Sequence, residues 1–366
     1  MKGEVMRRQL KKAFLIDTIF MAAAVLLLLI ANIAMALKNT AAQDDSSAFG
    51  FQTSGKENTE KSFLINSENA EKAGVAKAEI YINLLRKDTK KVERMSLEEY
   101  VVGAVAAEMP AEFPIEALKA QAVACRTYAM RKVARKLLHS GYERQKVYLC
   151  DDFAHCQAYI DKNQMKQKWG KNFTKYYQKL CSAVMATKGE VLVYNGEIID
   201  CLFHAASGGR TEDAREVFGQ SIPYLKSVVS RGEEACPKFS GEFYFSCDEF
   251  VKRLKSFYPN LKLSAKDIAS QVKVLQRTNT QRVKMVKVGN IKISGEKFRQ
   301  IFGLYSTEFW IYPQQSRIEI RTRGYGHGLG MSQWGAGYLA RQGKSYKEIL
   351  FYYYKNVKIY RVKLKV

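Results

Sequence analysis

The sequence predicts an α+β protein with an N-terminal transmembrane helix, a flexible tether, and a mixed helix/strand extracytoplasmic body of two lobes. Residues 1–37 combine a basic tip with an apolar run, and residues 38–76 are polar with little periodicity. Residues 77–366 mix helical and strand periods without βαβ regularity, which indicates α+β. With 47% hydrophobic residues, the 366-residue chain can bury a sizeable core. We expect residues 222–300 to form an inserted second lobe.

The apolar run from Ile19 to Leu37 is long enough to cross a bilayer, at roughly 28 Å for a helix. Basic residues before it predict a cytoplasmic N-terminus and a body outside the membrane. The triplet Ala34-Met35-Ala36 resembles a signal-peptidase site, so a cleaved secretory signal is the alternative.

The body begins with an alternating strand at 78–86, followed by helices at 97–108 and 114–138. Ser96 and Glu99 form a capping-box pattern at the start of the first helix, and Pro110 ends it. Further expected elements are a helix at 172–187, a hairpin at 190–201 around Asn195-Gly196, a helix at 248–257, strands within 271–292, helices at 331–341 and 346–354, and a closing strand at 357–366.

Glu108 is the first candidate catalytic residue. Tyr100, Ala104 and Glu108 follow at helical spacing, so the carboxyl continues the apolar face at the helix end. Partial burial near the negative end of a helix dipole raises the pKa of a carboxyl, as a general acid requires. A surface glutamate at a frayed helix end is the alternative.

A second candidate site lies at Cys150, His155 and Cys156, which place three soft ligands within seven residues. Structural zinc takes four nitrogen or sulfur ligands, and His139 upstream is our candidate for the fourth. The alternatives are a Cys150–Cys156 disulfide or two free thiols.

The remaining cysteines and the charge set bounds on partners. Of the seven cysteines, Cys125 falls on an apolar helix face, and Cys236 and Cys247 are candidates to pair, although spacing does not fix connectivity.

The net charge is +23, and residues 1–37 hold five basic and two acidic side chains, so residues 38–366 carry +20. A secreted topology disfavours nucleic acid as the polyanion and favours cell-wall glycan and its anionic polymers. A basic surface that serves only solubility remains open.

Three motifs carry a family resemblance. They are the Glu-Met-Pro segment at 104–129, the segment FHAASGGRTED at 203–213, and the Gly-rich segment GYGHGLGMSQWGAGYLA at 324–340. Together they resemble the stage II sporulation protein D family, membrane-anchored peptidoglycan lytic transglycosylases, over roughly residues 75–366. Phe218 departs from the family pattern, which has tryptophan there.

The resemblance implies a lyase that cleaves the bond between N-acetylmuramic acid and N-acetylglucosamine in stem-peptide-free strands. Glu108 is then the single acid–base, and the products end in 1,6-anhydro sugars; Asp213 is a distant second acid. The family also implies a single-pass protein of the mother-cell membrane that acts during engulfment, with stage II sporulation proteins P (an amidase) and M as partners. Some relatives bind zinc through two cysteines and two histidines around a segment like 150–156, although the upstream histidine is displaced here.

Further residues are expected to contact the glycan. Gln121, Arg126 and Tyr128 follow Glu108 on the next helix, with a helix surface and one long arginine as the alternative. The others sit in Gly-rich turns, where backbone approaches a ligand closely: His204, Ser207, His327, Ser332 and Gln333. Hydrogen bonding within the fold is the alternative role for the histidines.

Two other functions compete with this one. Serine beside histidine fits a Ser/His hydrolase, but no acidic orienter or Gly-x-Ser-x-Gly elbow accompanies them. A non-catalytic wall-binding module is the main rival, because amidase-enhancer proteins share parts of these motifs.

Overall fold

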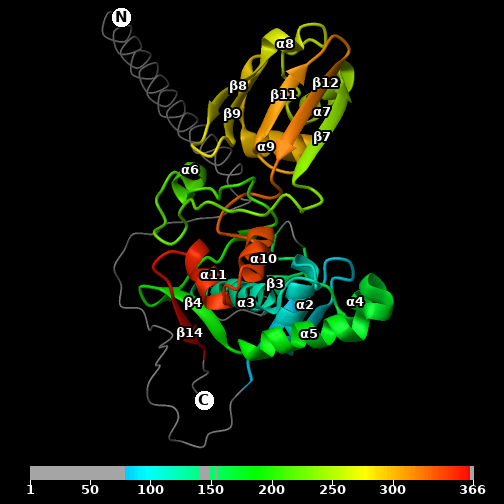
Figure 1. Ribbon diagram of the computed structural model, residues 1–366. Coiled ribbons are helices and arrows are strands. Elements are labelled where there is room, and N and C mark those ends of the chain that lie inside the picture. The colour runs from blue at the N-terminus through cyan, green and yellow to red at the C-terminus, as the bar shows by residue number, and fades with distance from the viewer. Residues whose placement is uncertain (1–78, 140–148, 153–154, 363–366) are drawn as a thin grey trace, which may run out of the picture. The chain divides into compact units, whose positions relative to one another are not determined.

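The computed structural model describes residues 79–139, 149–152 and 155–362, and these form a mixed α and β fold (Figure 1). The predicted anchor and tether lie outside the described residues. Within the described ranges, no helix is both long and apolar enough to cross a membrane.

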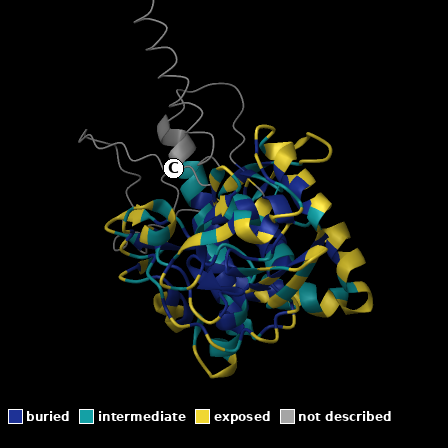
Figure 2. Ribbon diagram, turned by 90° about the horizontal axis from the view of Figure 1, so that it is seen from above, coloured by how far each residue is buried: buried dark blue, intermediate teal, exposed yellow. Residues whose placement is uncertain are grey.

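A layer of helices forms the first core. Helix α2 (Leu97–Glu108), α3 (Ile115–His139) and α5 (Phe173–Ala186) pack on one another, and α10 (Gln333–Arg341) and α11 (Tyr346–Tyr353) pack on α3. Figure 2 shows the buried residues, in dark blue, gathered in the interior of the fold and the exposed ones, in yellow, toward its margins. The predicted bounds of α2 are confirmed, because the Ser96 hydroxyl accepts the Glu99 N–H at 3.2 Å and Met109 is extended before Pro110.

Small sheets border the helices. In the first sheet, β1 (Tyr81–Leu85) pairs with antiparallel β2 (Val92–Ser96) and with parallel β3 (Leu149–Cys150). In the second, β4 (Glu190–Tyr194) lies between β14 (Lys358–Arg361) and β5 (Glu197–Ile198). In the third, β6 (Phe203–His204) pairs with parallel β13 (Met331–Ser332). The predicted turn between β4 and β5 is confirmed, since Asn195 and Gly196 both have positive φ. Two short helices were not predicted, α4 (Lys162–Trp169) and α6 (Ala214–Phe218).

The second core belongs to a strand lobe that runs from residue 240 to 323, later than the predicted 222–300. Its elements are β7 (Ser240–Ser246), α7 (Cys247–Phe257), α8 (Ile268–Gln271), β8 (Val272–Arg277), β9 (Val283–Val288), β10 (Ile291–Ser294), α9 (Gly295–Phe302), β11 (Phe309–Pro313) and β12 (Arg317–Arg323). The boundary moves because β12 pairs with both β7 and β11 and buries Ile318 and Ile320 in the same core.

A buried ion pair joins the helices of the first core. Arg126 on α3 is fully buried, and its Nη2 lies 2.5 Å from a carboxylate oxygen of Glu98 on α2. The same guanidinium donates to the carbonyls of Val184 and Glu190, both at 3.2 Å, and Glu98 also accepts the Gly189 N–H at 3.0 Å. All of these partners lie inside the protein. The expectation that Arg126 lines a glycan groove is therefore wrong, because its donors are used to connect α2, α3, α5 and β4.

Replacing Arg126 with methionine should lower the free energy of unfolding by about 3–5 kcal/mol, because Glu98 would remain as a buried, uncompensated charge. Chemical denaturation of the purified variant measures this. The double change Arg126→Met with Glu98→Leu should recover most of the loss. An unchanged unfolding midpoint for Arg126→Met, with weakened glycan binding, would contradict the structural role.

Candidate active site

Glu108 is the last residue of α2, and its partly buried carboxylate has two donors from distant parts of the chain. The Ala158 N–H donates to Oε1 at 2.7 Å, and Gln333 Nε2 lies 3.4 Å from Oε2. The hydrogen bond from Ala158 is the shorter of the two, and its donor is a backbone amide. Oε1 is therefore held as an acceptor, which leaves Oε2 as the oxygen that can carry a proton.

The Gly-rich motif delivers Gln333 to this site. Ser332 pairs with His204 across β13 and β6, and its hydroxyl caps α10 by accepting the Gly335 N–H at 3.2 Å. The preceding Gly330 has φ of 71°, and a Cβ there would lie 1.9 Å from the Leu202 carbonyl oxygen. Only glycine fits at that approach. Ser332 is thus a helix cap in the interior, and Gln333 is the residue of this motif that contacts Glu108.

The segment before α4 delivers the Ala158 N–H. Gln157 Nε2 donates to the Tyr100 hydroxyl at 2.9 Å, and the Tyr159 ring stacks on Tyr100 with centroids 5.6 Å apart. Gly103 on α2 makes room for this ring, because a Cβ there would lie 2.2 Å from Tyr159. Side-chain packing on both sides of Ala158 therefore fixes the amide that faces Glu108.

The electrostatics of Glu108 match the sequence-based expectation. Burial raises its pKa above the ordinary value, while the Ala158 N–H, Gln333 and the Lys168 ammonium oppose that rise. Lys168 on α4 also donates to the Ala106 carbonyl at 2.8 Å, in the last turn of α2. Burial thus favours the protonated carboxyl, and these three neighbours support the carboxylate once it ionises.

Asp213, the second acid considered from the sequence, has a different role. It is the N-cap of α6 and accepts the Arg215 N–H at 2.9 Å, with Lys226 Nζ 3.6 Å from its carboxylate. Its hydrogen bond and its ion pair stabilise the start of α6.

Cys150, His155 and Cys156 come together as predicted. Their ligand atoms lie within 4.8 Å of one another, with His155 Nδ1 3.3 Å from Cys150 Sγ and 3.4 Å from Cys156 Sγ. Both cysteines are free thiols, so the structure does not contain the alternative disulfide. This donor set fits three of the four positions of a tetrahedral zinc site. His139 ends α3, and its side chain lies outside the described part of the chain.

The other cysteines and Tyr128 complete this region. Cys236 and Cys247 are also free, so the suggested pair is absent, and Cys125 is fully buried in the first core as expected. Tyr128 hydrogen-bonds with Cys156, and burial raises its pKa. Tyr128 therefore borders the thiol cluster.

The remaining predicted contact residues have partners inside the protein. Gln121 is fully buried on α3 and donates to Cys125 Sγ at 3.3 Å. Ser207 donates to both carboxylate oxygens of Glu233 at 2.9 Å. For Gln121 and Ser207, burial and these bonds contradict a direct contact with glycan.

His204 and His327 hold the Gly-rich loop between them. His204 Nδ1 donates to the Leu329 carbonyl at 3.0 Å, and His327 Nδ1 accepts the Leu329 N–H at 3.0 Å. Burial lowers the pKa of His204 to about 3 and that of His327 well below its ordinary value. Both rings are therefore neutral at physiological pH. Their hydrogen bonds to Leu329 orient the backbone that leads to Gln333.

Sequence reasoning missed the Ala158 N–H, Lys168 and the buried Glu233. A backbone amide carries no sequence signal, and Lys168 is one of several lysines on a polar helix. Glu233 lies in a loop without a motif, and only the fold shows that it accepts three backbone N–H groups.

Comparison with known proteins supports the motif-based resemblance. The sequence model of the stage II sporulation protein family matches residues 85–194. Stage II sporulation protein D of Bacillus amyloliquefaciens is 38% identical over 280 residues, 76% of this chain and 78% of that protein. Its counterpart in Bacillus subtilis (strain 168) is 36% identical over 76% of this chain and 79% of that protein. An amidase enhancer of Bacillus subtilis is 26% identical over 69% of this chain and 39% of that protein.

Proposed function

This chain belongs to the stage II sporulation protein D family of sporulation proteins, and on that premise we propose that it is a peptidoglycan lytic transglycosylase with Glu108 as its acid–base. The observation that carries the proposal is one carboxyl of raised pKa, held by the Ala158 N–H and Gln333. Hydrolysis by water usually uses two carboxylates that flank the bond. Lytic transglycosylation uses one, because the nucleophile belongs to the substrate.

The reaction divides into two proton transfers at one oxygen. Glu108 Oε2 first gives its proton to the glycosidic oxygen as the bond from C1 of N-acetylmuramic acid breaks. The C6 hydroxyl of the same sugar then attacks C1 and returns a proton to Glu108, which forms the 1,6-anhydro ring. No water is consumed, and the carboxyl ends as it began.

The neighbours of Glu108 stabilise the ionised carboxylate that exists between the two proton transfers. After the first transfer the carboxylate is charged, and the Ala158 N–H, Gln333 Nε2 and the Lys168 ammonium all favour that form. Burial favours the protonated form before it. The rate should therefore fall as pH rises through the raised pKa, because the proton donor is lost.

We extend the proposal to the setting that the family implies. The chain would sit in the mother-cell membrane by its N-terminal apolar segment, with a cytoplasmic N-terminus and the body facing the septal space. Its partners would be glycan strands and stage II sporulation proteins P and M. The net charge of +23 supports attraction to an anionic wall.

The proposal also includes structural zinc at Cys150, His155 and Cys156, with His139 as the candidate fourth ligand. Zinc bound there would cross-link the chain on the N-terminal side of Gln157, Ala158 and Tyr159. Its effect on Glu108 would come through the position of the Ala158 amide.

The full-length chain incubated with stem-peptide-free glycan should release fragments that end in 1,6-anhydro-N-acetylmuramic acid, detected by mass spectrometry. Glu108→Gln should abolish release, because no second acid replaces it. The matched control is Glu112→Gln, a neighbouring exposed acid, which should keep activity. Fragments heavier by one water would make the protein a hydrolase. Binding without products from the unaltered chain would favour a wall-binding module that assists an amidase.

Purified protein should contain about one zinc ion per chain, and Cys150→Ser or Cys156→Ser should remove it. Elemental analysis measures the content, and chelation should lower the thermal unfolding temperature. Cys181→Ser is the matched control, since Cys181 lies outside the cluster, and it should keep its zinc. Equal metal content in all variants would rule out this site.

A further inference from the structure

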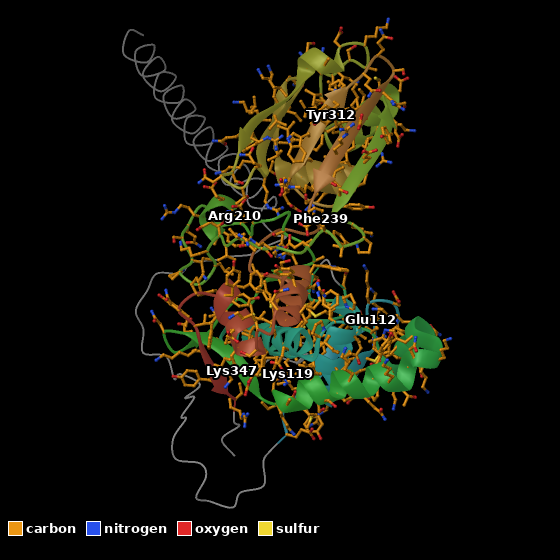
Figure 3. All side chains as sticks on the ribbon, in the orientation of Figure 1. Glu112, Lys119, Arg210, Phe239, Tyr312 and Lys347 are labelled. Atoms are coloured by element: carbon orange, nitrogen blue, oxygen red, sulfur yellow. The ribbon has the colours of Figure 1, made fainter. Side chains whose placement is uncertain are left out.

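A pocket of about 390 Å³ lies beside the Ser-Gly-Gly-Arg part of the motif at 203–213. Residues 208–210, Phe239 and Thr280 line it together with the charged side chains of Glu234, Glu308 and Arg323. Its volume is within the range of about 300–1,000 Å³ typical of small-molecule sites. None of its lining residues is a hydrogen-bond partner of Glu108. Figure 3 labels Arg210 and Phe239 on the loops that border it.

The wall is rigidly built. The buried Glu233 carboxylate accepts the N–H groups of Ser207 and Gly208 at 2.9 Å and of Gly209 at 3.1 Å. Gly208 has φ of 85°, and a Cβ there would lie 2.5 Å from Glu308 Oε2. Glycine thus allows the loop to lie directly against the Glu308 carboxylate.

Glu308 and Arg323 form an ion pair in the lining of the pocket. Glu308 is 2% exposed, and its Oε1 lies 2.9 Å from Arg323 Nε, while the Arg323 side chain is 51% exposed. Burial raises the pKa of Glu308 to about 7, against the effect of Arg323 and the buried Arg282. A buried carboxyl of this kind in a pocket is typical of ligand sites.

We propose that this pocket is a saccharide subsite that holds one neutral hexosamine ring of a glycan strand, away from the bond that Glu108 cleaves. Adjacent sugar hydroxyls both donate and accept, which matches a paired carboxylate and guanidinium. The Phe239 ring offers an apolar surface for the C–H face of a sugar. The lining carries Glu234 and Glu308 as well as Arg210 and Arg323, so it is not the purely cationic cluster that would select an anionic group.

The proposal rests on the proposed function only in naming glycan as the source of the sugar. A second subsite would hold a strand at two points, which favours longer strands over short ones by raising the effective concentration at Glu108.

The test measures binding without turnover. The full-length Glu108→Gln variant is titrated with the neutral tetramer of N-acetylglucosamine, by calorimetry and by NMR of the backbone amides. Phe239→Ala and Arg323→Gln, each added to that background, should raise Kd roughly tenfold, and the Gly208 and Gly209 amides should shift on binding. Tyr312→Ala, an exposed aromatic residue of the strand lobe, should leave Kd unchanged. Phe239→Tyr should keep the affinity even if Phe239→Ala unfolds the loop.

Three results would overturn the subsite: unchanged Kd in both pocket variants, unmoved amides at 208 and 209, or binding only of an oligomer with free carboxylates. These outcomes are distinct from a failure of the catalytic proposal. Binding at the pocket without product from the unaltered chain would rule out the transglycosylase proposal and support the subsite. Product formation without binding at the pocket would support the transglycosylase proposal and rule out the subsite.

Discussion

The buried ion pair between Glu98 and Arg126 is the interaction on which the site depends. Glu98 is near the start of α2 and Glu108 is its last residue, so the pair fixes the helix that carries the acid. Arg126 also holds carbonyls of α5 and β4, which sets the position of α2 against the rest of the first core. A buried ion pair of this kind contributes little net stability, but removing one of its two charges is strongly destabilising because the other charge stays buried without a partner. Its value here is in fixing geometry.

Around Glu108, most polar groups of the motifs act on the backbone. Ser332 caps α10, and His204 and His327 hold Leu329. These bonds bring a single side chain, Gln333, to the acid. Preorganised donors at a carboxyl cost little reorganisation when its charge appears, which suits an acid–base that must change state twice in one turnover. The glycine-rich character of the motif follows from close backbone approaches such as that at Gly330.

Local patterns predicted the elements well. The capping serine, the proline and the apolar period placed α2 at its observed bounds, and Asn195-Gly196 placed the turn of its hairpin. The strand lobe was misplaced because β7 pairs with β12 across more than 70 residues, and no local signal reports such a pairing. The same limit applied to the site. Glu108 and the thiol cluster followed from local spacing, whereas the burial of Arg126 and Gln121 depended on helices that pack from elsewhere in the chain.

The central claim is that Glu108 is an acid whose pKa is raised by burial and moderated by its donors. An NMR titration of the Glu108 carboxyl carbon measures this directly, in the unaltered chain and in Gln333→Leu. The account predicts a pKa above 4.5 in the unaltered chain and a further rise in Gln333→Leu, because a donor to the ionised form is removed. The folded state then binds the proton more tightly than the unfolded state, so the protonated acid persists to higher pH. A pKa at or below 4.5 in the unaltered chain, or a fall in Gln333→Leu, would contradict the account.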